Sequence, residues 1–175
     1  MRKFVVVAAL VLAACKGKPS SQLSSNLAAE NKVAVRPVTL YYQGVDMLLG
    51  AELRNVALPE NPAAAMPVVV RELVKPPATP NRARSFPADT IVRAAYLLPD
   101  GNAFVDLGGP TLTQGWGTGS HEEMMAIYAV VQTVTANFPE VKRVRILING
   151  EPAETLAGHI NISRSLAPAP TLVAR

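Results

Sequence analysis

The chain has 175 residues, of which 49% are hydrophobic and 17% are charged, and its formal net charge is +4. This length suits one domain with short terminal segments and excludes two full domains, while the composition excludes a disordered chain. The basic residues between 71 and 93 are scattered among prolines rather than clustered with aromatic side chains, which argues against nucleic-acid binding.

The first 14 residues have the layout of a secretory signal peptide. Arg2 and Lys3 precede an apolar run at 4–12, and small residues follow it up to Cys15. The run is too short for a hydrocarbon core of about 30 Å, so it does not predict a transmembrane helix. We expect residues 1–14 to be absent from the mature protein, which removes two of the 17 cations and leaves 15 against 13 anions.

Residues 12–15, Leu-Ala-Ala-Cys, resemble a lipobox, the site where bacterial lipoproteins are acylated on the cysteine and cleaved before it. Cys15 is the only cysteine, so no internal disulfide can form, and acylation would protect an otherwise free exported thiol. The sequence therefore predicts an exported protein that faces the periplasm or cell surface and is held at a membrane by lipid on Cys15. Lys16, rather than Asp, favours the outer membrane by resemblance to known sorting rules.

The rest of the chain divides into three parts. Residues 15–34 contain the cysteine and a polar segment expected to be a flexible tether. Residues 35–163 are predicted to form the folded domain, and residues 164–175 a Pro/Ala-rich tail.

The first half of the domain predicts two strands and a short helix. The strands are expected at 38–42 and 48–56, where alternation points Glu52 and Arg54 away from Leu53. Residues 59–67 are interpreted as a loop that leads into a helix at 68–74, with Pro67 in its first turn. The valines of 68–74 also allow a strand, and residues 75–90 are interpreted as a surface loop.

The second half predicts a hairpin, a long helix and a last strand. The hairpin joins 91–98 to 103–107 through a turn at 99–102. A capping box formed by Ser120 and Glu123 begins a helix that continues to Phe138 at helical spacing. A strand at 144–148 ends at an Asn-Gly turn. This order predicts an α+β fold with a single mixed or antiparallel sheet and one long and one short helix packed on one face.

The glycine-rich loop before the long helix is the main candidate for binding. Its spacing fits neither phosphate-loop pattern, and no lysine follows it. Trp116, flanked by Gly115, Gly117 and Gly119, can enter a pocket on a partner or stack on a sugar, and it can equally cover the local core. The loop is therefore a candidate for binding either a protein or a glycan such as peptidoglycan.

No residue set predicts catalysis, a metal or a cofactor. His121 and His159 are the only histidines, too few for a zinc site; His121 is expected to face solvent and His159 to satisfy a turn. Ser120 and His121 are adjacent on a helix and diverge, which argues against a serine hydrolase. Asp106 has no carboxylate partner and is expected to accept hydrogen bonds from a turn.

The order of several short motifs resembles the GerMN domain, a family known from sporulation and spore-germination proteins and from bacterial envelope lipoproteins. The motifs lie at 38–42, 52–54, 71–73, 86–90, 98–107, 119–123, 127–141, 144–150 and 155–160. The resemblance implies a non-enzymatic envelope module whose fold is similar to ring-building domains that assemble side by side. It implies no catalytic or metal-binding residue, and it favours a scaffold that binds another envelope protein or further copies of itself.

Overall fold

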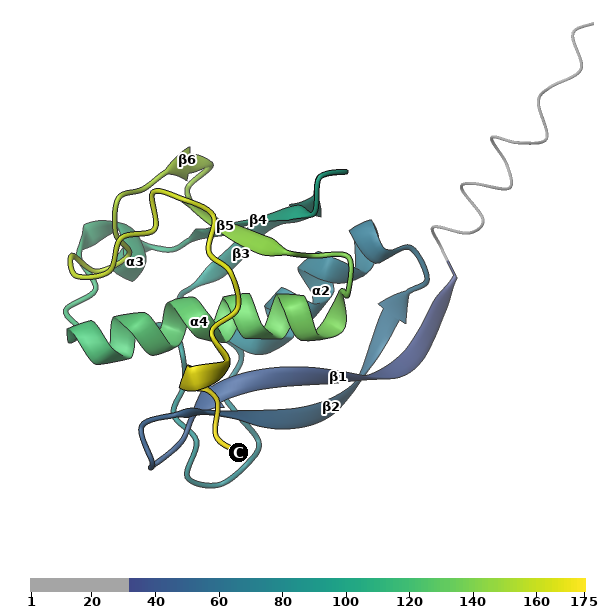
Figure 1. Cartoon of the computed structure of the whole chain (residues 1–175), viewed down its shortest axis with the longest axis horizontal. Helices are drawn as coiled ribbons and strands as arrows, with labels where there is room; N and C mark the ends of the chain where they lie inside the picture. The colour runs from purple at the N-terminus through teal and green to yellow at the C-terminus, as the bar shows by residue number, and fades with distance from the viewer. Residues whose placement is uncertain (1–31) are drawn as a thin grey trace, which may run out of the picture.

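The computed structural model of the protein describes residues 32–175 (Figure 1). The predicted signal peptide, Cys15 and nearly all of the predicted tether lie outside the described residues. Every helix within 32–175 is too short or too polar to cross a bilayer.

The strands form two separate sheets. β1 (Val33–Gln43) and β2 (Leu49–Pro59) make an antiparallel hairpin. The second sheet has the order β3-β4-β5-β6, in which only β4 and β5 are parallel. Its strands are Ile91–Leu97, Asn102–Gly108, Arg143–Ile148 and Glu151–Pro152. The α+β class is confirmed, whereas the strands divide into two sheets where one was predicted.

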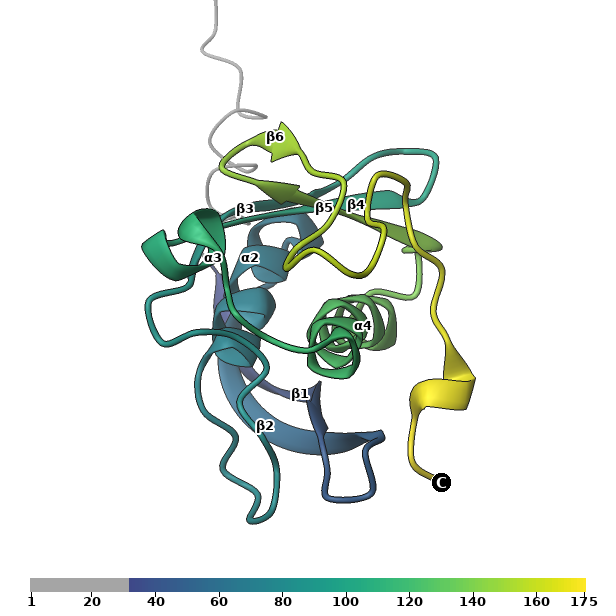
Figure 2. The ribbon, with the colours of Figure 1, turned by 90° about the vertical axis from the view of Figure 1, so that its left-hand side faces the viewer.

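The two longer helices lie between the sheets, which explains this division. Figure 2 shows α2 (Pro62–Val74) and α4 (Ser120–Asn137) with the hairpin on one side and the four-stranded sheet on the other. In α4, residues 125–127 and 129–134 are all buried, so the helix has apolar contacts on more than one face. A helix buried on both sides keeps the two sets of strands apart. Two shorter helical turns, α3 (Pro110–Gln114) and η1 (Pro170–Leu172), complete the fold.

The helix α2 begins earlier than predicted. The Asn61 side chain accepts a hydrogen bond from the Ala63 N–H at 2.9 Å, and Pro62 occupies the first helical position. Pro67 consequently lies inside the helix rather than in its first turn. The residues interpreted as a loop are thus helical from 62 onward, because the Asn cap and the alanines that follow favour a helix.

The hairpin of β1 and β2 turns a polar pair inward. As predicted, Glu52 and Arg54 point away from Leu53, but Leu53 is the exposed residue at 74%, while Glu52 is only 5% exposed. The predicted hairpin of β3 and β4, the helix from Ser120 and the strand β5 are also confirmed.

Side chains of α4 cover the edge of β1. Asn137 accepts from the Thr39 N–H at 3.0 Å and donates to the Thr39 carbonyl at 2.7 Å. Thr133 accepts from the Tyr41 N–H at 3.1 Å. These bonds satisfy backbone groups that an uncovered edge strand would leave open.

The C-terminal segment crosses α4 and joins the two sheets. Leu166 pairs with Val144 of β5, and Val173 pairs with Leu49 of β2. The Ala174 N–H also donates to the Leu49 carbonyl at 2.9 Å. Figure 1 shows this segment, in yellow, passing from the upper sheet over α4 to the hairpin.

Candidate functional site

The glycine-rich loop connects α3 to α4 and places Trp116 against the core. The Trp116 ring is half-buried and tilted on Phe86, with ring centroids 6.2 Å apart. Gly115 has a φ of +105°, which favours glycine, and a Cβ at Gly115 or Gly117 would meet no atom within 4 Å. The loop is therefore open on its outer side, while the indole covers the local core.

A small cavity lies beside Trp116. Its volume is about 170 Å³, and Gln43, Ser85, Glu122 and Met125 contribute to its walls. Pockets that bind small molecules usually measure about 300–1,000 Å³. This cavity can hold a few water molecules or a single side chain, but not a disaccharide.

The predicted capping box at the start of α4 is wrong. Gly119 is the N-cap, and no side chain caps the helix there. Glu123 is instead fully buried and turns toward residues 155–159. One carboxylate oxygen accepts from the N–H groups of Leu156 and Ala157, at 2.9 and 2.7 Å. An exposed Glu at this position would accept a hydrogen bond from the backbone at the start of the helix. Glu123 is buried instead, and a buried carboxylate needs several hydrogen-bond donors, which residues 155–159 supply.

The second oxygen of Glu123 contacts His159 twice. The His159 N–H donates at 2.8 Å, and the ring Nδ1 lies 3.0 Å away. Burial raises the pKa of Glu123, but hydrogen bonds from Ala157, His159 and Ile160 outweigh it and hold the pKa below its usual value. His159 thus belongs to the turn as predicted, and Glu123 anchors that turn to α4.

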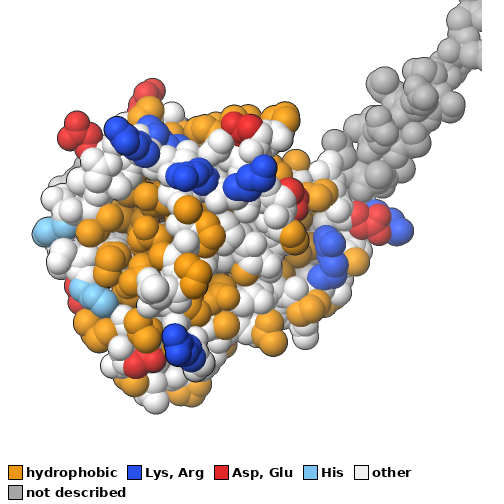
Figure 3. Space-filling model, viewed as in Figure 1, with side chains coloured by type: hydrophobic (Ala, Val, Ile, Leu, Met, Phe, Trp, Pro, Cys, Tyr) orange, Lys and Arg blue, Asp and Glu red, His pale blue; other side chains and the backbone are white. Residues whose placement is uncertain are grey.

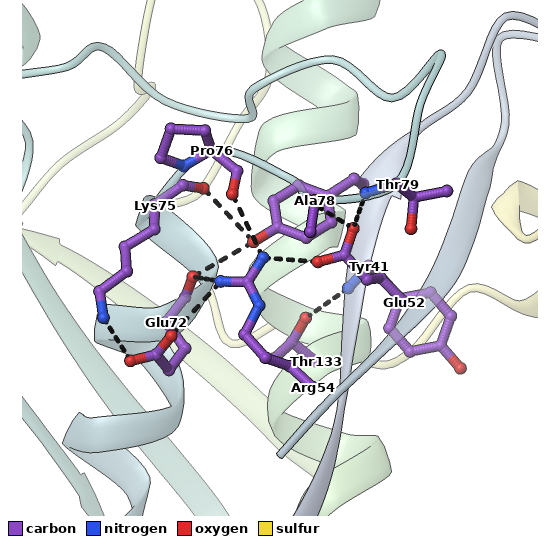
Figure 4. A network of polar contacts seen from close by, with 10 residues as sticks. Tyr41, Glu52, Arg54, Glu72, Lys75, Pro76, Ala78, Thr79 and Thr133 are labelled. Atoms are coloured by element: carbon purple, nitrogen blue, oxygen red, sulfur yellow. Dashed lines mark hydrogen bonds and ion pairs between the residues drawn. The ribbon is translucent and has the colours of Figure 1, made fainter. Parts of the chain in front are cut away.

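A second buried carboxylate anchors the loop after α2 (Figure 4). Glu52 accepts from the N–H groups of Ala78 and Thr79, at 3.0 and 2.8 Å, and pairs with Arg54. Burial raises the pKa of Glu52, but the Thr79 N–H and the Arg54 guanidinium dominate and lower it to about 2. No pattern in the neighbouring residues indicates that this pair lies under a loop.

Arg54 and Tyr42 donate hydrogen bonds to backbone carbonyls at the C-terminal end of α2. Arg54 donates to the Glu72 carbonyl at 3.1 Å and to the Pro76 carbonyl at 3.2 Å. The Tyr42 hydroxyl donates to the carbonyls of Glu72 and Lys75, and burial raises its pKa to about 12. These contacts satisfy carbonyls that a helix end leaves without partners.

Asp106 and His121, the other polar residues considered in the sequence analysis, lie in contact with the fold rather than in a reactive site. Asp106 accepts from the Gly150 N–H at 2.8 Å, as expected of a turn acceptor, and from Arg93 Nε at 3.0 Å. His121, expected in solvent, is half-buried, and its Nε2 is buried without a hydrogen-bond partner among the described residues. Within 32–175, no three His, Cys, Asp or Glu side chains are placed to hold a metal ion.

An open trough of about 890 Å³ lies between α4 and the C-terminal segment. Tyr41 and Gln132 line it on one side, and Thr171 and Val173 on the other. Figure 3 shows hydrophobic side chains across the middle of this face and Lys and Arg side chains around them, along the top, at the right and near the lower end. The trough brings no set of ionisable groups together.

The comparisons with known proteins agree with this fold. Residues 39–154 match the Germane family, described as "Sporulation and spore germination". No curated protein matches the sequence.

Three solved structures are similar to the chain. A putative lipoprotein from Clostridium perfringens has 17% identity and a TM-score of 0.54, over 77% of this chain and 88% of the other. The tandem GerMN domains of the sporulation protein GerM from Bacillus subtilis have 20% identity and a TM-score of 0.56, over 77% of this chain and 46% of the other.

The first GerMN domain of that protein alone has 20% identity and a TM-score of 0.53, over 75% of this chain and 97% of the other. At such identities, these similarities establish the fold. The family match spans most of the described residues, and it includes the positions of Glu52, Arg54, Glu72 and Glu123. The chain belongs to the Germane family of sporulation and spore-germination domains.

Proposed function

We propose that this chain is an exported lipoprotein, anchored by lipid on Cys15, whose Germane domain binds another envelope protein and catalyses no reaction. The lipobox-like residues 12–15 support the anchor. The similarity to a putative lipoprotein from Clostridium perfringens is consistent with it. The family description suggests sporulation, germination or a related envelope assembly process as the setting.

The outer edge of β3 is the observation that carries the binding proposal. β3 is the last strand on one side of its sheet, so one row of its backbone groups faces away from β4. Ile91 and Tyr96 on β3 are 53% and 41% exposed, and Leu98, which follows the strand, is 38% exposed. A shift in register between Val92 and Ala94 interrupts the strand. The stretch from Ala94 to Leu97 is therefore where a partner strand can add.

The buried carboxylates support a role without catalysis. Glu52, Asp106 and Glu123 each accept hydrogen bonds from backbone N–H groups that belong to loops or turns. A general base needs an oxygen that is free to take a proton from a substrate. These oxygens are occupied by structural donors.

Peptidoglycan binding through Trp116 is the alternative. The indole packs on Phe86, and the cavity beside it is smaller than a disaccharide requires. Titration with muropeptides while Trp116 fluorescence is followed tests this alternative, and a saturable spectral shift would favour it over the protein-binding proposal.

Crosslinking in intact cells tests the protein-binding proposal. A photoreactive phenylalanine analogue at Tyr96 is expected to capture a specific protein, identified by mass spectrometry. The same analogue at Glu140, exposed in the turn after α4, is the matched control. Equal capture at both positions, or no protein captured at Tyr96, would overturn the proposal.

A further inference from the structure

The hairpin of β1 and β2 has an outer face with no charged side chain. Alternate residues from Val33 to Tyr41, and their partners from Pro59 to Ala51, share this face. Val33, Val35 and Leu53 on it are 56%, 71% and 74% exposed. The opposite outer surface of the protein, on the four-stranded sheet, has the side chains of Arg143 and Arg145 on it.

The tip of the hairpin extends this apolar surface. Val45 is 82% exposed and Met47 is 47% exposed, so the hairpin contains five of the eight large hydrophobic side chains that are exposed in the described residues. Asp46 lies between them and accepts from the Leu48 N–H, which ties it into the turn. Exposed apolar residues concentrated on one element mark an interaction surface.

Cations lie beside this tip. The backbone of Arg82 forms a β-bridge with Gly44, and the Ala83 N–H donates to the Gln43 carbonyl at 2.8 Å, so the loop after α2 runs along the end of the hairpin. The half-buried Arg82 guanidinium donates to the Tyr42 carbonyl at 3.3 Å. Arg84 on the same loop is exposed. Apolar side chains flanked by Lys or Arg are typical of surfaces that enter the boundary between lipid headgroups and acyl chains.

The position of the proposed anchor favours a bilayer as the occupant. Cys15 is joined to Lys32 by about 17 residues, which span at most about 60 Å when fully extended. The anchored chain enters the domain at Val33, the first residue of the uncharged face. A lipid on Cys15 would therefore keep the domain within reach of the membrane, with its attachment point at the end of this face.

A second copy of the chain fits the face less well. Strands of 11 residues at about 3.3 Å per residue, in a ribbon about 10 Å wide, offer about 350 Å². A stable protein interface needs about 800 Å² from each partner. A lipid surface has no such minimum, because the anchor already holds the protein in place.

We infer that the uncharged outer face of the β1–β2 hairpin, together with its tip at Val45 and Met47, docks on the surface of the membrane. This inference rests on the proposed lipid anchor. With the hairpin on the bilayer, the four-stranded sheet, with β3 at its edge, lies on the opposite side of the molecule (Figure 2). The domain would then present its partner-binding edge to the space beyond the membrane.

A single fluorescent probe tests the docking. Cys15 is the only cysteine, so in the lipidated protein Leu53→Cys supplies one free thiol for an environment-sensitive dye. Glu151→Cys, exposed on β6 at the far side of the protein, is the matched control. In vesicles of phosphatidylcholine and phosphatidylglycerol, the dye at 53 is expected to shift to the blue and to be quenched by nitroxide lipids several-fold more than the dye at 151. Unfolding curves of both labelled proteins establish that each is folded.

Failure of the anchor and failure of the docking give different results. If Cys15 is not acylated, the dye also labels Cys15, and the proposed anchor fails. The dye on Leu53→Cys in the Cys15→Ser chain then tests docking alone at high vesicle concentration, where the same blue shift is expected. Equal and water-like emission at 53 and 151 in both chains would overturn the inference. A shift at 53 that depends on protein concentration without vesicles would assign the face to a second copy instead and would also overturn it.

Discussion

Replacing Glu123 with Gln is the sharpest test of the buried polar contacts. The Glu123 carboxylate is fully buried and accepts from Leu156, Ala157 and His159. In the Gln variant an NH₂ group takes the place of one oxygen and faces N–H donors. The variant therefore keeps the shape of the side chain but leaves donors without an acceptor.

The expected loss follows from the number of donors affected. Each oxygen serves two donors in the structure, and leaving a buried donor unsatisfied costs about 1–3 kcal/mol. We therefore expect Glu123→Gln to lower the free energy of unfolding by about 3 kcal/mol. Glu122→Gln, at an exposed neighbouring position, is the control and is expected to change it by less than about 0.5 kcal/mol.

The difference between wild type and Glu123→Gln depends on pH in a defined direction. The pKa of Glu123 in the folded protein lies below the ordinary value of 4.5. The carboxylate therefore contributes its full stability above about pH 4.5, and that contribution is lost as the pH falls through the folded pKa. Urea unfolding from pH 7 to pH 3 should show the two proteins converging in acid.

Hydrogen exchange locates the effect. Faster exchange of the amides at 156–159 is expected in Glu123→Gln, with little change in β1 and β2. If Glu123→Gln unfolds at the same urea concentration as Glu122→Gln at pH 7, the carboxylate does not hold this turn and the reasoning is refuted.

Two further substitutions test the packing of the hairpin. Gly50→Ala would place a Cβ 1.4 Å from Arg82 Nη1, so the guanidinium must move and give up its hydrogen bond to the Tyr42 carbonyl. The expected cost in urea unfolding is about 0.5–1.5 kcal/mol, and it should be smaller in an Arg82→Ala background. An equal cost in both backgrounds would contradict this contact. Asn137→Ala removes the acceptor and donor that serve Thr39 and should cost about 1–2 kcal/mol and speed exchange of the Thr39 amide; unchanged exchange would contradict the covered edge.

The elements with strong local signals were predictable from the sequence. The helix from Ser120 follows from its long helical spacing, and the β3–β4 hairpin from the turn at Asp100 and Gly101. The alternation around Leu53 was also right. In each case, neighbouring residues are sufficient to determine the local structure.

The features that depend on distant contacts were not predictable. The capping box at Ser120 fits the local pattern, but Glu123 binds residues more than 30 positions away. The division into two sheets depends on α4 being buried on both sides. Small residues such as Ala126 and Ala129 occur on buried and on exposed helix faces alike, so the sequence pattern does not indicate that α4 is buried on both sides. Glu52, Arg54 and Glu72 matched a family motif, and only the structure gives them a physical role, which is to join β2 to the end of α2.

Fractionation of cells that express the wild-type chain or Cys15→Ser tests the central claim most directly. The account predicts that the wild-type protein is found with the membranes and leaves them only in detergent, while Cys15→Ser is released in soluble form with an unchanged circular dichroism spectrum and unfolding midpoint. A Cys15→Ser protein that stays in the membrane fraction after washing at high salt and alkaline pH would contradict the account.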